Sequence, residues 1–319
     1  AIMVCPDHWR GMGPVCADQG EVAVNAPVTD ILPADLTDLS DSQLMKLERK
    51  IALKHSGMFP WLMVIWAFGN LICWLALWPL VLFDYIPLWL GFLIATINMS
   101  LVYLPTHDAQ HDIIARPGQK LRWLNELVGH ATSWMIVFPF QVLRVTHMDH
   151  HRHANDPQLD PDYTSHAAGP WTALWSTIQE RQPKGQRQHD YLGSLDRNGR
   201  QDLILLSIAY KLAFLAILFA LAWSGYALEA FFLWWLPYHI ALSYLVFFLS
   251  WAPHHPGTKQ GRYQDTRSWK SAAGNIGSMG MQFHVVHHLH PYIPLDRTPA
   301  AYREMRPLLV ARGCDLGEN

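Results

Sequence analysis

The sequence of 319 residues contains only four cysteines, Cys5, Cys16, Cys73 and Cys314, and none of them belongs to a CxxC pair. This scarcity argues against a disulfide framework and against a cysteine-held iron–sulfur cluster, and it is typical of a reducing compartment. Only 16% of the residues are charged, against roughly 25% in ordinary soluble proteins. The net charge is −2 and no basic run occurs, so nucleic-acid binding is not expected.

Long apolar segments are abundant instead, since half of the residues are hydrophobic and 15 are tryptophan. Four segments are long enough to cross a bilayer, which takes about 20 residues, and they are residues 61–83, 87–106, 203–223 and 226–252. The alternative, a buried bundle in a soluble protein, is disfavoured because helices that are apolar on every face are usually membrane spans. We therefore predict an all-α integral membrane protein with four transmembrane helices in two hairpins.

A fifth apolar stretch, residues 127–143, is shorter and is interrupted by His130 and Pro139. We expect it to be interfacial or partly re-entrant. His130, and His239 within the fourth span, are expected to be core histidines with satisfied hydrogen bonds.

Positive charge is distributed unevenly between the two sides of these spans. Of 24 lysines and arginines, five lie in residues 1–59, ten in residues 107–201 and eight in residues 253–319. The remaining one, Lys211, lies inside a span, and the two outer turns contain none. By the positive-inside rule, all three polar regions and both termini are cytoplasmic, as in a bacterial inner-membrane protein.

The regions outside the spans predict a simple division of the chain. Residues 1–40 are expected to form a loosely ordered arm, and residues 1–59 contain no apolar run typical of a secretory signal. Residues 41–59 are predicted to be an amphipathic interfacial helix whose stripe of Leu44, Leu47 and Ile51 would lie on the membrane. Residues 60–310 form the membrane domain, and residues 311–319 form a C-terminal tail.

Eight of the 18 histidines fall into three clusters, HDAQH, HMDHH and HVVHH. On a helix, histidines at positions i and i+4 point the same way, so each cluster can present two or three imidazoles to one point. Imidazole suits iron, copper, nickel and zinc, although zinc is disfavoured because HExxH is absent. Surface histidines on polar loops are the alternative, but they do not explain three matched clusters. The clustered histidines are His107, His111, His147, His150, His151, His284, His287 and His288.

These three boxes, placed between two membrane hairpins, resemble those of the fatty acid desaturase superfamily over nearly all of residues 60–310. The runs HHRHANDPQLDPD (150–162) and HVVHHLHPYIPLDRTPAAYREMRPLL (284–309) resemble the carotenoid β-ring hydroxylases of bacteria and cyanobacteria. The resemblance implies a cytoplasmic helical cap that holds two iron ions, with O2 as co-substrate. It also adds His254, which stands 30 residues before His284, as a ninth metal ligand.

Polar residues in and near the boxes are candidates for a supporting role. A metal-bound imidazole usually donates its second N–H to a carboxylate or carbonyl. The predicted supporting residues are Asp108, Asp149, Asp156 and His153, and Asp112 and His290 are further candidates. The turn Asp160-Pro161-Asp162 is expected mainly to shape the cap over the metals.

The sequence therefore predicts an O2-dependent membrane oxidoreductase that attacks an unactivated C–H bond of a lipid. Hydroxylation of a β-carotene-type ring is the leading prediction, and a fatty acyl desaturase, hydroxylase or alkene-forming decarboxylase is the alternative. A histidine-rich metal transporter is a remote alternative, because its histidines would lie within the bilayer at broken helices. No flavin or nicotinamide fingerprint occurs, so the family resemblance implies an external electron donor such as ferredoxin.

Overall fold

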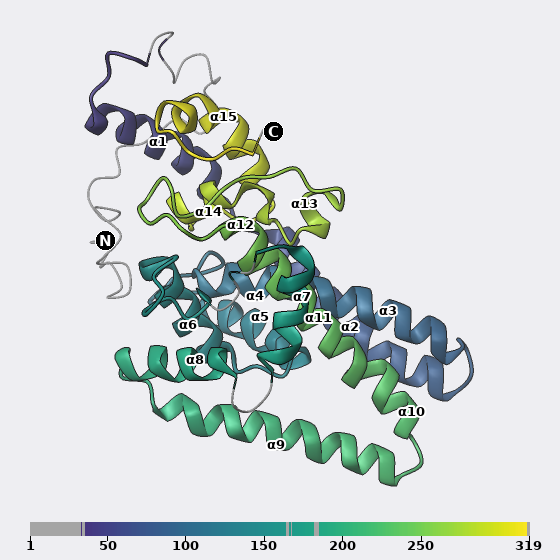
Figure 1. The fold of residues 1–319 in the computed structure, drawn as a ribbon. Coiled ribbons are helices and arrows are strands. Elements are labelled where there is room, and N and C mark those ends of the chain that lie inside the picture. The colour runs from purple at the N-terminus through teal and green to yellow at the C-terminus, as the bar shows by residue number, and fades with distance from the viewer. Residues whose placement is uncertain (1–32, 34–35, 164–165, 167, 182–184, 318–319) are drawn as a thin grey trace.

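The computed structural model describes residues 33, 36–163, 166, 168–181 and 185–317. Most of the predicted N-terminal arm and the last two residues of the predicted tail lie outside this part of the chain. The described residues are helical apart from turns, loops and one isolated bridge between Arg267 and Asp315, which confirms the all-α prediction. Figure 1 shows the arrangement of the elements. Those before the second hairpin are α1 (Asp41–Ser56), α2 (Trp61–Leu82), α3 (Leu88–Leu101), α4 (Tyr103–Gln110), α5 (Arg122–Met135), α6 (Phe140–His153), α7 (Pro170–Gln179) and α8 (Gln186–Arg197).

The remaining elements form the second hairpin and the C-terminal part. They are α9 (Asp202–Trp223), α10 (Ala227–Ala230), the π-helix η4 (Phe231–Trp235), α11 (Leu236–Leu245), the π-helix η5 (Val246–Trp251), α12 (Ala252–His254), α13 (Gly274–Gly277), the 3-10 helix η6 (Met281–Phe283), α14 (His284–Leu289) and α15 (Thr298–Ala311).

Four helical segments within the described residues are long and apolar enough to span a membrane, as the sequence predicts. They are Trp61–Leu82, Leu88–Gln110, Asp202–Trp223 and Ala227–His254. The two outer turns are short because each contains a residue with positive φ, Asp84 at 56° and Gly225 at 93°. Glycine adopts this conformation without a steric penalty, and aspartate tolerates it better than most residues. The hairpins therefore return the chain to the side that carries the histidine boxes.

Tryptophan side chains connect the spans to one another. The indole N–H of Trp74 in α2 donates to the carbonyl of Leu233 at 3.0 Å, and that of Trp234 donates to the carbonyl of Met135 at 3.1 Å. In Figure 1, α2, α3, α10 and α11 run together, whereas α9 diverges from them along much of its length. The burial of the spans agrees, since α9 is the least buried of the four. The second span is the most buried of the four. It ends at the first histidine box, and the fourth span ends at His254.

The stretch 127–143 differs from the expected interfacial segment. It forms the end of α5 and the start of α6, and its residues Val128, Met135, Val137 and Phe140 are buried. The helix α5 packs against α2 and α4. An apolar face packed against protein has the same sequence pattern as one packed against lipid, so the hydropathy pattern alone did not distinguish them.

The helix α1 also differs from its expected role at the membrane. Its stripe residues Leu44 and Ile51 are buried in one cluster with residues of α14 and α15, and Leu47 packs on the edge of that cluster. Lys54 pairs with Glu304 of α15 at 2.9 Å, and Figure 1 shows the two helices side by side. The stripe is therefore covered by protein, and α1 packs directly behind the third histidine box.

Candidate metal centre

Four helical segments carry the histidines that the sequence singled out. The first box lies at the end of α4, at the tip of the second span, and the second box lies at the end of α6. His254 ends α12 at the tip of the fourth span, and the third box forms α14. The chain turns sharply after the first two boxes, with φ of 56° at Asp112 and 65° at Asn155. These turns let helices that are distant in sequence converge on one place.

The first histidine group draws on all three boxes, and its four ring nitrogens lie within 4.8 Å of one another. Its members are buried, and they are His107, His111, His147 and His287. The Nε2 atoms of His111 and His147 are 2.9 Å apart. His151 adjoins this group, because its Nε2 lies 3.2 Å from that of His147 and 3.0 Å from that of His287. Several nitrogens are therefore directed toward one small volume.

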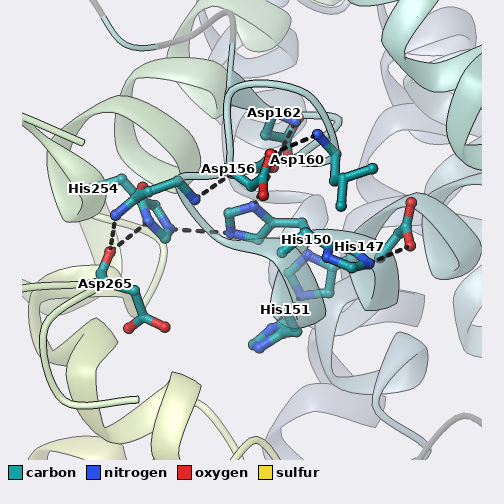
Figure 2. A network of polar contacts seen from close by, with 12 residues as sticks. His147, His150, His151, Asp156, Asp160, Asp162, His254 and Asp265 are labelled. Atoms are coloured by element: carbon teal, nitrogen blue, oxygen red, sulfur yellow. Dashed lines mark hydrogen bonds and ion pairs between the residues drawn. The ribbon is translucent and has the colours of Figure 1, made fainter. Parts of the chain in front are cut away.

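The second histidine group combines the last two boxes with His254, and it consists of His150, His254, His284 and His288. The Nε2 atom of His254 lies 3.1 Å from that of His150 and 3.2 Å from that of His284. Figure 2 shows the His150 and His254 rings facing each other. The structure thus brings eight of the nine histidines named from the sequence into two adjoining groups, including His254, which was placed by resemblance, and it places His151 beside the first group.

Burial controls the protonation of most of these rings. Burial, with the charges of neighbouring histidines, holds the pKa of His147, His151 and His284 well below the usual range. The same causes lower the pKa of His287 and His288. These imidazoles are therefore neutral at neutral pH, which is the form that binds a metal.

His150 is the exception, and Asp160 is the cause. Burial acts to lower the pKa of His150, but the charge and hydrogen bond of Asp160 outweigh it and raise that pKa to about 9. The Nδ1 of His150 donates to Asp160 Oδ1 at 2.8 Å, as Figure 2 shows. The backbone N–H of Asn155 donates to the other carboxylate oxygen at 2.9 Å. A contact of this kind fixes the tautomer and orientation of histidines in metal-binding proteins.

From the sequence, Asp160 is expected only to shape its loop, so its contact with His150 is not predicted. The available signal was its position ten residues after His150, in a turn that can fold back over α6. His254 has a different support, since its Nδ1 donates to the backbone carbonyl of Asp265 at 3.1 Å. No side-chain pattern predicts a backbone acceptor of this kind.

Two of the predicted supporting carboxylates have other partners. Asp108 is fully buried and accepts from the backbone N–H of Leu295 at 3.3 and 3.4 Å. It lies 4.0 Å from His107 Nδ1, beyond hydrogen-bond distance. Asp149 accepts from the guanidinium of Arg197 at 2.7 Å. Asp108 therefore joins the first box to the segment before α15, and Asp149 joins α6 to α8.

The other two predicted supporting residues lie on the rim. Asp156 accepts from the backbone N–H groups of Gln158 and Leu159 at 2.8 and 3.1 Å, so it shapes the turn that leads to Asp160. His153 is partly exposed and lies 3.8 Å from Asp149. Neither side chain has a hydrogen bond to a ring of the two groups within the described residues.

His130, His239 and His166 belong to neither histidine group. His130 and His239 each have a polar contact, as expected: His130 Nε2 lies 3.0 Å from Gln141 Nε2, and His239 Nδ1 lies 3.4 Å from the guanidinium of Arg181. His166, which the sequence analysis did not single out, has its ring 6.4 Å from that of His254. It stands at the edge of the second group.

The donor set fits metal ions. Two neutral imidazoles that face each other through Nε2, such as His147 and His151, hold at most one proton between these atoms, so at least one Nε2 lone pair in such a pair is available to a cation. The buried Nδ1 atoms of His151, His284 and His287 have no acceptor among the described residues. A cation between the rings would take the inward lone pairs and leave each Nδ1 as a donor.

The comparisons with known proteins agree with this geometry. The sequence model of the family described as fatty acid desaturase matches residues 83–315, which is well over half of the chain. The chain belongs to the fatty acid desaturase family. With its four apolar helices, it is an integral membrane protein, and its histidine groups make it a metal-dependent member. Family membership also confirms the predicted class, a membrane oxidoreductase.

Individual relatives are distant. The chain is 26% identical over 218 residues to a zeaxanthin 4-ketolase of Chlamydomonas reinhardtii, which is 66% of this chain and 43% of the relative. It is 24% identical over 265 residues to an sn-1 oleoyl-lipid 12-desaturase of Anabaena variabilis, 73% of this chain and 72% of the relative. An sn-1 acyl-lipid omega-3 desaturase (ferredoxin) of Nostoc sp. (strain 36) is 23% identical over 236 residues, 65% of this chain and 62% of that protein. The chain thus spans less than half of the ketolase.

Proposed function

We propose that this chain is an O2-dependent oxygenase with a di-iron centre, and that it hydroxylates the ring of a β-carotene-type carotenoid. The observation that carries the proposal is the pair of adjoining four-histidine groups at the tips of the second and fourth spans. Two groups suit two ions, and a set made of imidazoles alone suits iron. The position at the ends of membrane spans suits a substrate that arrives from the bilayer.

The ligands follow from the two groups. His107, His111, His147 and His287 would hold one ion, with His151 beside them, and His150, His254, His284 and His288 would hold the other. Bound iron would supply the chemistry that activates O2 for attack on a C–H bond.

The other residues of the centre would exclude water and orient the ligands. His107, His284 and His287 are at most 1% exposed, and a water-poor site protects a reactive oxidant from side reactions. Asp160 and the Asp265 carbonyl would keep the Nε2 atoms of His150 and His254 directed inward. Electrons would come from an external carrier such as ferredoxin, which the name of the Nostoc desaturase includes.

We also propose that the histidine side of the protein faces the cytoplasm of a bacterial inner membrane. The support is the distribution of lysine and arginine, of which 23 of 24 lie outside the spans and on the side of the boxes. Positive residues are retained on the cytoplasmic side during insertion.

Two observations support a carotenoid substrate. One is the similarity to the zeaxanthin 4-ketolase, and the other is the sequence around the second and third boxes. Ring hydroxylation and ketolation both begin by oxidising a ring C–H bond. Acyl-lipid desaturation is the second candidate, and it is favoured by the similarity to the Anabaena desaturase, which covers 72% of that relative.

Product analysis tests whether the substrate is a carotenoid or an acyl lipid. The chain would be expressed with a ferredoxin in bacteria that make β-carotene, and pigments and membrane fatty acids would be measured from the same cells. New hydroxylated carotenoids that disappear in a His150→Ala variant would support the proposal. Unchanged carotenoids with new double bonds in the fatty acids would favour the second candidate.

A further inference from the structure

The third box has little support of its own. Its helix α14 spans only six residues, His284–Leu289, yet it carries three of the nine histidines. A helix this short is unstable in isolation, because nucleation costs more than a few backbone hydrogen bonds return. Its position must therefore be fixed by what packs against it. Its apolar residues Val285 and Val286 are fully buried, in one cluster with Ile51 of α1.

A buried carboxylate of α1 lies at the end of this short helix. Glu48 is 1% exposed, and its Oε1 lies 2.9 Å from Nε2 of His290. Nη2 of Arg262 donates to the same oxygen at 3.1 Å, and the hydroxyl of Tyr263 donates to Oε2 at 3.1 Å. A buried charge is costly unless it is paired and hydrogen-bonded, and Glu48 satisfies that condition through residues at the end of α14 and in the preceding loop.

These contacts act on the backbone that holds the third box. The Nη2 of Arg262 also donates to the carbonyl of Leu289, the last residue of α14, at 3.2 Å. His290 follows directly, and its backbone N–H donates to the carbonyl of Val286 at 2.9 Å. Glu48 therefore holds Arg262 against the C-terminal end of α14 and meets the next side chain, two residues after His288.

A second ion pair between α1 and the C-terminal part has no such connection. Lys54 and Glu304 join α1 to α15 at 2.9 Å, and in the described part of the chain neither side chain has a hydrogen bond or ion pair with a residue of the third box. Attachment of α1 to the protein can thus be separated from support of α14.

We propose that Glu48 is a positioning residue for the third histidine box, acting through Arg262 and His290. The proposal rests on the ligand assignment made under the proposed function. It gives α1 a role in the metal centre in place of the membrane contact that its amphipathic pattern predicted.

Two measurements on the full-length protein test this role, with Glu48→Gln compared with the matched control Glu304→Gln. The first is amide hydrogen exchange of residues 284–290 in the metal-free protein. The second is the rate at which a chelator removes iron from the loaded protein. Glu48→Gln should speed exchange in that segment and raise iron release by up to about 10-fold, the lower end of the effect of losing a direct partner of a metal ligand, because Glu48 acts through Arg262 and His290. Glu304→Gln should resemble the wild type in both, even if its melting temperature falls.

The outcomes separate the positioning role of Glu48 from the assignment of the histidines as metal ligands. Equal exchange and equal iron release in the two variants would overturn the positioning role, as would a Glu48→Gln variant that loses only melting temperature. If the wild type binds no iron, the ligand assignment fails, while hydrogen exchange still decides whether Glu48 orders α14. If Glu48→Gln does not accumulate, Arg262→Gln removes the donor that links Glu48 to the carbonyl of Leu289 and should give a shift in the same direction. No shift in that variant would also refute the proposal.

Discussion

The two histidine groups differ in how the protein supports them. In the second group, Asp160 accepts from Nδ1 of His150, and a backbone carbonyl accepts from Nδ1 of His254. In the first group, the buried ring nitrogens of His107 and the Nδ1 of His287 have no acceptor among the described residues. The protein thus orients His150 and His254 of the second group in advance, whereas it provides no such acceptor for His107 and His287 in the described part of the chain.

This contrast has a consequence for metal binding. An outer acceptor raises the basicity of a ligand imidazole and fixes its tautomer, so it strengthens the metal bond. We therefore expect the second group to hold its ion more tightly. The proton on His150 must leave when the metal binds, because the metal needs the free Nε2 lone pair.

The largest effect is expected from removing a ligand of the supported group. His150→Ala should abolish turnover and remove the ion of the second group, while the four spans still insert in the membrane. Metal content and product formation on the purified protein measure this effect. His130→Ala is the control, because His130 belongs to neither group. Full activity of His150→Ala would refute the ligand assignment.

Removing Asp160, which supports His150, should have a smaller effect than removing His150 itself. Asp160→Asn keeps the size of the side chain but loses the charge that fixes His150, and it should weaken metal binding at the second group by about 10–100-fold. Metal titration of the apoprotein measures the change. Asp149→Asn is matched to it, because Asp149 is equally buried but contacts Arg197. Equal loss in both variants would show a general effect of removing a buried carboxylate.

Removal of metal from the wild type should expose the same difference without a mutation. With an excess of chelator, two phases of release are expected, and the slower one should belong to the second group by a factor of about ten, the lower end of the range for outer-shell support. Asp160→Asn should bring the two phases together. A single phase in the wild type would mean that the contrast in support has no effect on affinity.

Much of the fold follows from local patterns in the sequence. Long apolar segments and short turns are sufficient to place the four spans, because a span must satisfy its own backbone hydrogen bonds in lipid. The i, i+4 spacing of His107 and His111 predicts a shared direction on one helix. Resemblance supplied His254, and the structure places its ring beside His150 and His284.

The remaining features depend on tertiary contacts. The stripe of α1 has the pattern of a membrane-surface helix, and only the structure shows that α14 and α15 cover it. Asp160 lies in a turn-forming sequence, which predicts a role in the turn but not its hydrogen bond with His150. Asp149 and Asp156 stand closer to the box in sequence, yet they contact Arg197 and the backbone of the turn. Proximity in sequence was a poor guide to which carboxylate supports a ligand.

The smallest predicted effect concerns the turn that presents Asp160. Asp156 accepts from two backbone N–H groups, and its own carbonyl accepts from the N–H of Asp160 at 3.0 Å. Asp156→Ala should cost about 1 kcal/mol, as for loss of a capping side chain, and loosen the turn. Metal affinity of the second group should then fall only a few-fold, with the first group unchanged. Metal titration resolves the two groups, and Asp156→Asn, whose amide oxygen can still accept, should restore most of the loss. An equal decrease in both groups would show that the turn supports the whole centre rather than His150 alone.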